Sequence, residues 1–310
     1  MDQWLRRWIV YQRERFPLAA HVPLVAAFSA SAVCFSSLLR GHASLPSPAA
    51  LVAAFMTSLL FFLQLRIADE FKDFEEDARY RPYRPVPRGL VTLRELAWLG
   101  AVAAAVQLAI ALVLNASLVP LLIVTWTYLA LMTREFFARQ WLKAHPIAYM
   151  LSHMLILPLI DLYATACDWR VAGLSSPPAG LSWFLAVSFL NGLVVEIGRK
   201  TRAAADEEYG VDTYSALWGR NGAVWGWLFA VALTAGSAWQ ASVRIGTTAP
   251  TLVLLIVLAT LCVVVAKRFL RTSRPGSGRW LEAMAGVWTV VMYLGLGAAP
   301  LAFAAWRGGR

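Results

Sequence analysis

Nine runs of about twenty mostly apolar residues limit what this chain can fold into more than any other feature. A helix of roughly that length crosses the hydrocarbon core of a bilayer. Hydrophobic residues make up 59% of the chain and charged residues 15%, more apolar surface than a soluble protein of 310 residues can bury. We therefore predict an all-α, polytopic membrane bundle of about nine transmembrane helices. The predicted spans are 22–40, 49–67, 94–114, 117–133, 145–165, 181–198, 222–241, 249–266 and 281–304.

The N-terminal segment differs in character from these runs. Its sequence, MDQWLRRWIVYQRERF, mixes Trp, Ile and Val with four arginines. This composition predicts a helix over residues 1–20 that lies in the headgroup region of the membrane, the alternative being an ordinary soluble cap. No linker or internal repeat marks a second domain, so we expect one transmembrane domain over residues 1–310.

The basic residues predict the orientation. With the N-terminus inside, 23 of the 28 Lys and Arg residues fall in cytoplasmic segments. By the positive-inside rule, the two long charged loops, 66–94 and 196–221, are then cytoplasmic and cap a central cavity. We expect a multi-pass protein of a bacterial inner membrane. The net charge of +10 indicates this topology and contact with anionic lipid, and nucleic acid is not an expected partner. The five external basic residues are Arg40, Arg170, Arg244, Arg307 and Arg310.

Carboxylates are concentrated where the second span ends, in RIADEFKDFEEDARYRPYRPVPRG. On one continuous helix, Asp69, Asp73 and Asp77 lie at 0°, about 40° and about 80°, and Glu70 lies at about 100°. Carboxylates this close repel one another unless a cation neutralises them. Mg²⁺ binds a few carboxylates together with phosphate oxygens and water. We predict that these four acids hold Mg²⁺; the alternative is a solvated helix end whose acids pair with neighbouring basic side chains.

Arginines follow the acids in RYRPYRPVPRG. Its X-Pro steps and final Gly stop the helix, so the arginines lie on a loop that folds back. The planar guanidinium group suits bidentate contact with phosphate oxygens. We expect Arg79 and Arg84 to bind phosphate, and the segment as a whole to bind a diphosphate.

The stretch resembles the first aspartate-rich motif of the UbiA-type intramembrane prenyltransferases, Asn-Asp-x-x-Asp-x-x-x-Asp. Asp69 stands in the Asn place, and Glu70, Asp73 and Asp77 stand in the three Asp places. RPVPRG is similar to the Arg-Pro-x-x-x-Gly that follows in that family. The resemblance implies Mg²⁺-assisted ionisation of a polyprenyl diphosphate and capture of the allylic cation by an acceptor.

The second loop, NGLVVEIGRKTRAAADEEYGVDTYSALWG, is similar to the family's second motif, in which an Asp-x-x-x-Asp pair precedes a Gly. Alignment on Gly210, Thr213 and Gly219 puts Asp206 in the later Asp place, which implies a metal ligand there. Arg202 stands in the earlier place.

A cation therefore replaces one carboxylate of that pair. Glu196 offers an acid deeper in the helix, with Lys200 on the same face. We expect Arg199, Lys200 and Arg202 to bind the diphosphate where the family uses a second metal, the alternative again being a solvated helix end.

Three polar residues interrupt the apolar spans. Asp161 lies toward the outer part of the fifth span, where it is either a functional group facing a cavity or an interfacial polar group. His153 and Asn191 are interpreted as hydrogen-bonded packing residues rather than as catalysts.

These features predict an Mg²⁺-dependent intramembrane prenyltransferase that transfers a prenyl group to an aromatic or other lipophilic acceptor. A terpene cyclase of the same family, which uses the same donor site without an acceptor, is the first alternative. A divalent cation transporter is the second, although the arginines would repel cations.

Overall fold

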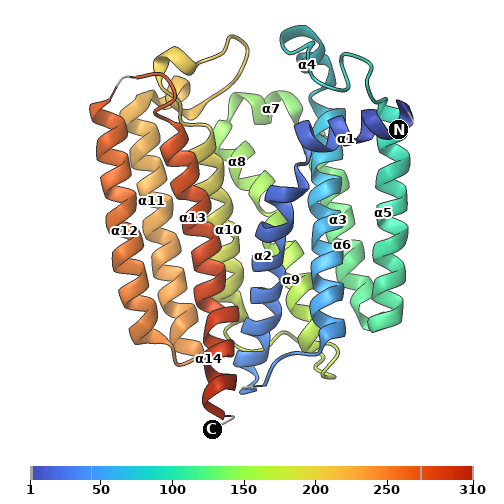
Figure 1. Ribbon diagram of the computed structural model, residues 1–310, viewed down its shortest axis with the longest axis vertical. Coiled ribbons are helices and arrows are strands. Elements are labelled where there is room, and N and C mark those ends of the chain that lie inside the picture. The colour runs from blue at the N-terminus through green and yellow to red at the C-terminus, as the bar shows by residue number, and fades with distance from the viewer. Residues whose placement is uncertain (1–2, 43, 273, 309–310) are drawn as a thin grey trace.

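The computed structural model describes residues 3–42, 44–272 and 274–308. Residues 1–2 of the predicted N-terminal helix and Arg310 lie outside this part of the chain. Within it, nine helical segments are long and apolar enough to cross a membrane, and no strand is present, so the predicted all-α membrane bundle is confirmed (Figure 1).

Each predicted span corresponds to one of these segments. The segments are α2 (Leu18–Leu39), α3 (Pro48–Lys72), α5 (Leu93–Leu114), α6 (Val119–Thr133), α8 (Pro146–Met154) with α9 (Ile156–Trp169), α10 (Leu181–Arg199), α11 (Tyr214–Arg244), α12 (Thr248–Arg271), and α13 (Arg279–Leu296) with α14 (Ala298–Gly308). Short helices α1 (Gln3–Arg15), α4 (Phe74–Tyr80) and α7 (Arg139–Ala144) lie at one end of the bundle (Figure 1).

Two spans are each broken into two helices, and a proline follows each break. Pro158 cannot donate to the carbonyl four residues earlier, and the helical hydrogen bonding is interrupted at Leu155, although the backbone angles of this residue stay helical. Pro300 has the same effect at Gly297. A side chain at Gly297 would also lie 2.1 Å from the carbonyl oxygen of Ser31, so glycine allows α13 and α2 to approach closely.

The middle of the bundle is formed by α2, α9 and α10. Helix α2 packs against α3, α9 and α13, and α10 packs against α9, α11 and α13. The spans of α2 and α10 are the most buried, whereas α5, α6 and α12 have largely exposed apolar surfaces that suit contact with lipid.

Asp161 belongs to this interior. It is fully buried on α9 and accepts a hydrogen bond of 2.8 Å from the hydroxyl of Tyr293 on α13. The same hydroxyl lies 3.1 Å from the hydroxyl oxygen of Ser188 on α10. Asp161 therefore links three helices by polar contacts.

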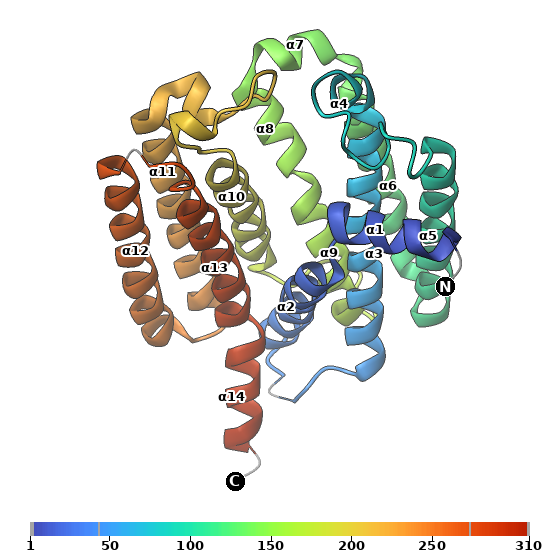
Figure 2. The same cartoon turned by 45° about the horizontal axis from the view of Figure 1, so that its top comes forward.

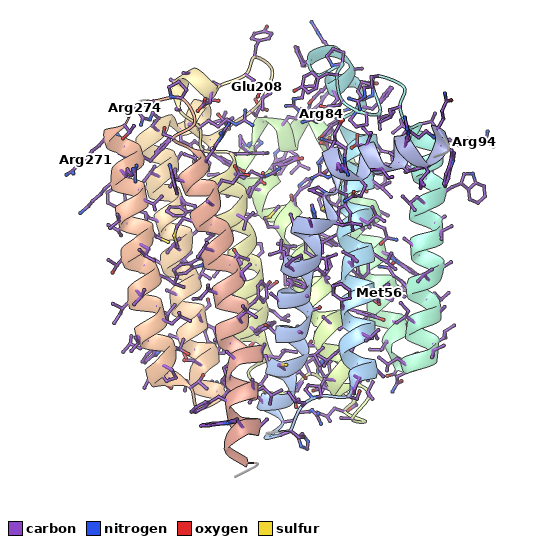
Figure 3. All side chains as sticks on the ribbon, viewed as in Figure 1. Met56, Arg84, Arg94, Glu208, Arg271 and Arg274 are labelled. Carbon is purple, nitrogen blue, oxygen red and sulfur yellow. The ribbon has the colours of Figure 1, made fainter. Side chains whose placement is uncertain are left out.

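Charged side chains gather at the end of the bundle that carries α1, α4 and α7, which we call the charged end (Figure 3). Helix α1, which is shorter than the predicted segment 1–20, lies across the bundle there (Figure 2). Ion pairs fix it in place, from Arg7 to Glu95 and from Arg15 to Glu70. Its contact with lipid headgroups stays a prediction.

One ion pair stabilises the opposite end. Arg40, after α2, donates two hydrogen bonds of 2.9 and 2.7 Å to the two carboxylate oxygens of Asp168 on α9. The hydroxyl of Ser36 donates a third, of 2.7 Å. Because Asp168 is almost completely buried, removal of Arg40 would leave its charge without its cationic partner.

We expect Arg40→Ala to destabilise the protein by about 3–5 kcal/mol, because it leaves a buried carboxylate unpaired. Thermal unfolding in detergent measures the loss. The double variant Arg40→Met with Asp168→Leu should be more stable than the single variant, since it removes both charges. Equal stability of Arg40→Ala and the wild type would contradict this role.

Candidate active site

A cavity of about 540 Å³ lies at the charged end. Its walls come from α3, α4, α8, the end of α10 and both charged loops. Its deeper lining is apolar and includes Leu65, Met154, Ile156 and Leu157. The cavity therefore joins a charged mouth to an apolar interior.

Three of the predicted acids share one wall. Asp69, Asp73 and Asp77 all line the cavity. Helix α3 ends at Asp73, but the hydrogen bonds from Asp73 N–H to the Asp69 carbonyl (2.9 Å) and from Asp77 N–H to the Asp73 carbonyl (2.8 Å) continue the helical pattern into α4. This continuity keeps the three carboxylates on one face, as their four-residue spacing indicates.

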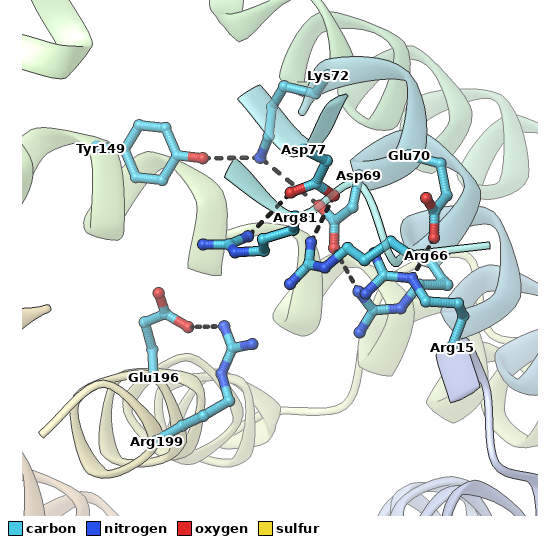
Figure 4. A network of polar contacts seen from close by, with 11 residues as sticks. Arg15, Arg66, Asp69, Glu70, Lys72, Asp77, Arg81, Tyr149, Glu196 and Arg199 are labelled. Atoms are coloured by element: carbon cyan, nitrogen blue, oxygen red, sulfur yellow. Dashed lines mark hydrogen bonds and ion pairs between the residues drawn. The ribbon is translucent and has the colours of Figure 1, made fainter. Parts of the chain in front are cut away.

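Glu70 and Arg79 do not line the cavity. Glu70 is buried beside α1 and pairs with Arg15 (Figure 4). A rotation of about 100° from Asp69 turns its carboxylate away from the shared wall. Arg79 is exposed and lies 5.3 Å from the ring of Tyr80.

The carboxylates of the shared wall differ in how far they are neutralised. Asp77 is buried between Arg81 (2.9 Å) and Arg84 (2.5 Å), one on each oxygen. Asp69 lies 3.4 Å from Arg66 and 3.6 Å from Lys72, which are looser pairs.

Asp73 forms no ion pair or side-chain hydrogen bond with any described residue. Burial raises its pKa to about 6, against the opposing attraction of Lys72, and the neighbouring carboxylates Asp69 and Asp77 raise it further. Asp73 is thus the acid of this wall that stays available to a cation.

The second charged loop, 196–221, carries basic side chains that line the cavity. Glu196 is buried at the end of α10, where it pairs with Arg199 at 2.6 Å (Figure 4). Lys200 pairs with it at 2.8 Å. Arg202 also lines the cavity, and its guanidinium lies 3.2 Å from the carboxylate of Glu208. All four residues that the sequence singled out between 196 and 202 therefore reach the cavity.

Asp206 does not reach it. Its carboxylate accepts a hydrogen bond of 2.7 Å from the backbone N–H of Gly276, in the turn between α12 and α13. Asp212 lines the cavity from the same loop instead. Asp212 is not among the predicted site residues; its position directly before Thr213, which caps α11, is a sequence signal that places it at a helix start.

The two loops meet beside the cavity. The ring of Tyr80 packs against Gly210, and Tyr209 lies edge-on to it with 5.9 Å between ring centroids. Gly210 has φ +77°, and a side chain there would lie 3.0 Å from the Tyr80 ring. Glycine therefore satisfies both the backbone conformation and the close contact.

Several lining residues were not predicted. Lys72 donates a hydrogen bond of 2.7 Å to the hydroxyl of Tyr149 (Figure 4). Arg81 lines the cavity, whereas Arg79 does not. The other unpredicted charged lining residues are Arg15, Arg66, Glu76, Glu135, Arg139, Lys143 and Asp212.

Taken together, ten basic and seven acidic side chains line the cavity. A surplus of cations suits a polyanionic ligand, and arginine suits phosphate oxygens in particular. The chemistry of the lining therefore favours a diphosphate.

Whether the cavity suits a metal ion depends on which of its carboxylates are free to bind one. In the described part of the chain, no three metal-binding side chains converge. Asp77 and Glu196 are occupied by basic partners, whereas Asp73 pairs with no described residue and Asp69 is only loosely paired on the same wall. Mg²⁺ is commonly held by one or two carboxylates with substrate phosphates, so the donors fit one such ion that is shared with a diphosphate.

Comparison with known proteins agrees with this geometry. The family model described as the UbiA prenyltransferase family matches residues 29–285. A UbiA homologue from Aeropyrum pernix K1 has a similar structure, with TM-score 0.66 and 18% identity over 88% of this chain and 98% of that one. A digeranylgeranylglyceryl phosphate synthase is also similar, with TM-score 0.64 and 14% identity over 97% and 99% of the chains. No curated protein matches the sequence. With more than three quarters of its length matched by the family model, this chain belongs to the UbiA prenyltransferase family.

Proposed function

We propose that this protein is an Mg²⁺-dependent intramembrane prenyltransferase that ionises a polyprenyl diphosphate and transfers the prenyl group to a lipophilic or aromatic acceptor. The observation that carries the proposal is the cavity itself. It sets Asp69 and Asp73 on one wall and Arg199, Lys200 and Arg202 among the residues of another, above an apolar interior.

The basic residues of the second loop bind the leaving group in this proposal. Ionisation places negative charge on the departing diphosphate, and fixed cations stabilise that charge. Arg199 and Lys200 are held by the buried carboxylate of Glu196, so their orientation is set before the substrate binds.

Asp73 and Asp69 are the residues that would hold Mg²⁺. The ion, when bound, supplies further neutralisation of the diphosphate oxygens. Arg81 and Arg84 neutralise Asp77, which keeps a third carboxylate from repelling the substrate.

The apolar interior receives the prenyl chain. Leu65, Ile156 and Leu157 present hydrocarbon rather than nucleophilic groups. Such a lining excludes water, which would otherwise capture the allylic cation.

A terpene cyclase is the second candidate, because Arg202 and the turned-away Asp206 depart from the family's second acidic motif. Incubation with geranylgeranyl diphosphate and Mg²⁺, without an acceptor, separates the two: a cyclic hydrocarbon product would favour the cyclase. We do not propose a cation transporter, because basic residues outnumber acidic ones in the cavity lining.

We predict that Asp73→Asn lowers donor turnover by at least about 100-fold, because it removes the carboxylate that is free to bind the metal. Pyrophosphate release at a series of Mg²⁺ concentrations measures this. Glu70→Gln is the matched control: it loses the pair with Arg15 and some thermal stability, but its Mg²⁺ response should equal that of the wild type.

The wild type should also show a pH signature. Because the pKa of Asp73 is raised to about 6, its carboxyl becomes protonated as the pH falls below 6, and protons then compete with the metal. The Mg²⁺ concentration for half-maximal rate should rise below pH 6 and stay constant above pH 7. A Mg²⁺ requirement that is the same in Asp73→Asn and the wild type would refute the role of Asp73.

Arg202→Asp should slow ionisation roughly 10- to 150-fold, since a charge-assisted contact contributes about 1.5–3 kcal/mol. Arg79→Asp makes the same charge change on an exposed residue outside the cavity and should have little effect. Single-turnover rates with geranylgeranyl diphosphate compare the two. Equal rates for both variants would place Arg202 outside the reaction.

We also propose that the charged end faces the cytoplasm of a bacterial cell, on the basis of the 23 basic residues that the predicted topology places there. A cysteine introduced at Ala78, which is exposed on α4, should react with a membrane-impermeant thiol reagent only in opened cells. Labelling in intact cells would show that the charged end faces the outside of the cell.

A further inference from the structure

A patch of basic side chains covers the end of α12 and the turn that joins it to α13. We call it the α12–α13 basic patch. Its members are all exposed, and they are Lys267, Arg268, Arg271, Arg274 and Arg279. Figure 3 shows Arg271 and Arg274 at the edge of the bundle, at its charged end. The patch is not part of the cavity lining, so the proposed reaction does not use it.

The charges of this patch are not neutralised by neighbouring acids. None of its five side chains forms an ion pair or a hydrogen bond with a described residue. The sequence from Thr213 to Leu281 contains no Asp or Glu. Asp206 reaches the turn from the second loop, where its carboxylate accepts the hydrogen bond from Gly276, and the exposed Glu282 follows on α13. Five cations against two acids leave a surplus of positive charge.

The basic residues of the patch are not needed to cap α12. Lys and Arg side chains near a helix C-terminus often donate to its last carbonyl groups. Here Arg220 of α11 donates to the carbonyl oxygens of Phe269 and Thr272 instead. The charges of the patch are therefore available to a ligand from outside the chain.

An apolar surface that suits acyl chains lies directly below the patch. On α12, Val257, Leu261 and Val264 are exposed, and their spacing of four and three residues places them on one face of the helix. Arg268 and Arg271 continue the same spacing, so they lie on that face at its end. One face of α12 thus changes from hydrocarbon to positive charge. A phospholipid has the matching order, with acyl chains that lead to an anionic headgroup.

An exposed aromatic residue adjoins the patch. The guanidinium of Arg268 lies 5.6 Å from the ring centroid of Trp280, whose side chain is exposed at the start of α13. Tryptophan is enriched at the level of the lipid headgroups. This pair therefore indicates that the patch borders the headgroup region.

The turn that carries the patch also contacts the second charged loop. A side chain at Gly278 would lie 2.6 Å from the carbonyl oxygen of Thr201 and 3.3 Å from Cα of Arg202, so the two backbones touch. In the same turn, the backbone N–H of Gly276 donates to the carboxylate of Asp206 at 2.7 Å. Arg202 lines the cavity. Direct contacts therefore connect the patch with a wall of the cavity.

We propose that the α12–α13 basic patch binds an anionic phospholipid, and that the bound headgroup stabilises the second charged loop through the turn Gly276–Gly278. The inference goes beyond the proposed function, because it involves no prenyl substrate. It gives a place in the fold to the contact with anionic lipid that the net charge indicates. Clusters of four or more basic residues beside a membrane helix suit headgroups with several negative charges, so cardiolipin should bind more tightly than phosphatidylglycerol.

Native mass spectrometry in a neutral detergent tests the site. The wild type is titrated with cardiolipin, phosphatidylglycerol and phosphatidylcholine, and only the two anionic lipids should show saturable binding. The patch variant Arg268→Gln, Arg271→Gln, Arg274→Gln should bind cardiolipin about 100-fold more weakly, the combined effect of three basic residues near an anionic surface. Lysine at the same three positions should keep most of the binding.

A scattered variant makes the same charge change at the same end of the bundle. Arg13, Arg94 and Arg134 are exposed, belong to three different segments, and form no ion pair with a described residue. Their replacement by Gln should leave cardiolipin binding unchanged. Without lipid, both triple variants should unfold at the wild-type temperature, because all six side chains are exposed. Inorganic phosphate should not displace cardiolipin, since it lacks acyl chains.

Hydrogen–deuterium exchange measures the effect on the second loop. Cardiolipin should slow the amide exchange of residues 200–212 in the wild type but not in the patch variant. Equal losses of cardiolipin binding in the patch and scattered variants, or displacement of the lipid by inorganic phosphate, would overturn the site. Saturable binding without slower exchange would overturn the role of the turn.

Discussion

Charge is costly in hydrocarbon, and this constraint organises the structure. The spans of the bundle exclude most ionisable groups, so the two charged loops are confined to helix ends. Because α3 and α10 run through the bundle to the same end, the acids that follow one helix face the cations that follow the other (Figure 4). A cavity lined by both signs of charge results, and the apolar spans beneath it form its deeper lining.

Within that cavity, neighbouring acids of one motif have different environments. Glu70 is fixed beneath α1 by Arg15, and Asp77 is enclosed by Arg81 and Arg84. Asp73 keeps its carboxylate free, at the junction of α3 and α4, and burial leaves it easier to protonate than an ordinary aspartate. Ion pairing therefore decides which carboxylates a cation can reach. The helix places the acids close together, and their arginine partners determine which of them stay unpaired.

The polarity of the cavity lining also changes along α8 and α9. Lys72 and Tyr149 belong to its charged part, and Ile156 and Leu157 to its apolar part. The imidazole of His153 lies between these regions, and the strained turn before α7 supports it from the side. Reacting groups of opposite polarity, a diphosphate and a prenyl chain, match the two regions.

The sequence by itself determined the class of fold, because twenty-residue apolar runs have few stable alternatives to membrane helices. It also determined the shared face of Asp69, Asp73 and Asp77, since their spacing is local to one helix. Tertiary structure alone decided the partners that come from distant segments. Arg15, 55 residues before Glu70, is the ion-pair partner of that acid, and Gly276, 70 residues after Asp206, donates its backbone N–H to the Asp206 carboxylate. It also gave His153 its place in the lining: helical spacing predicts which side chains share a face, but not which neighbouring helix that face meets.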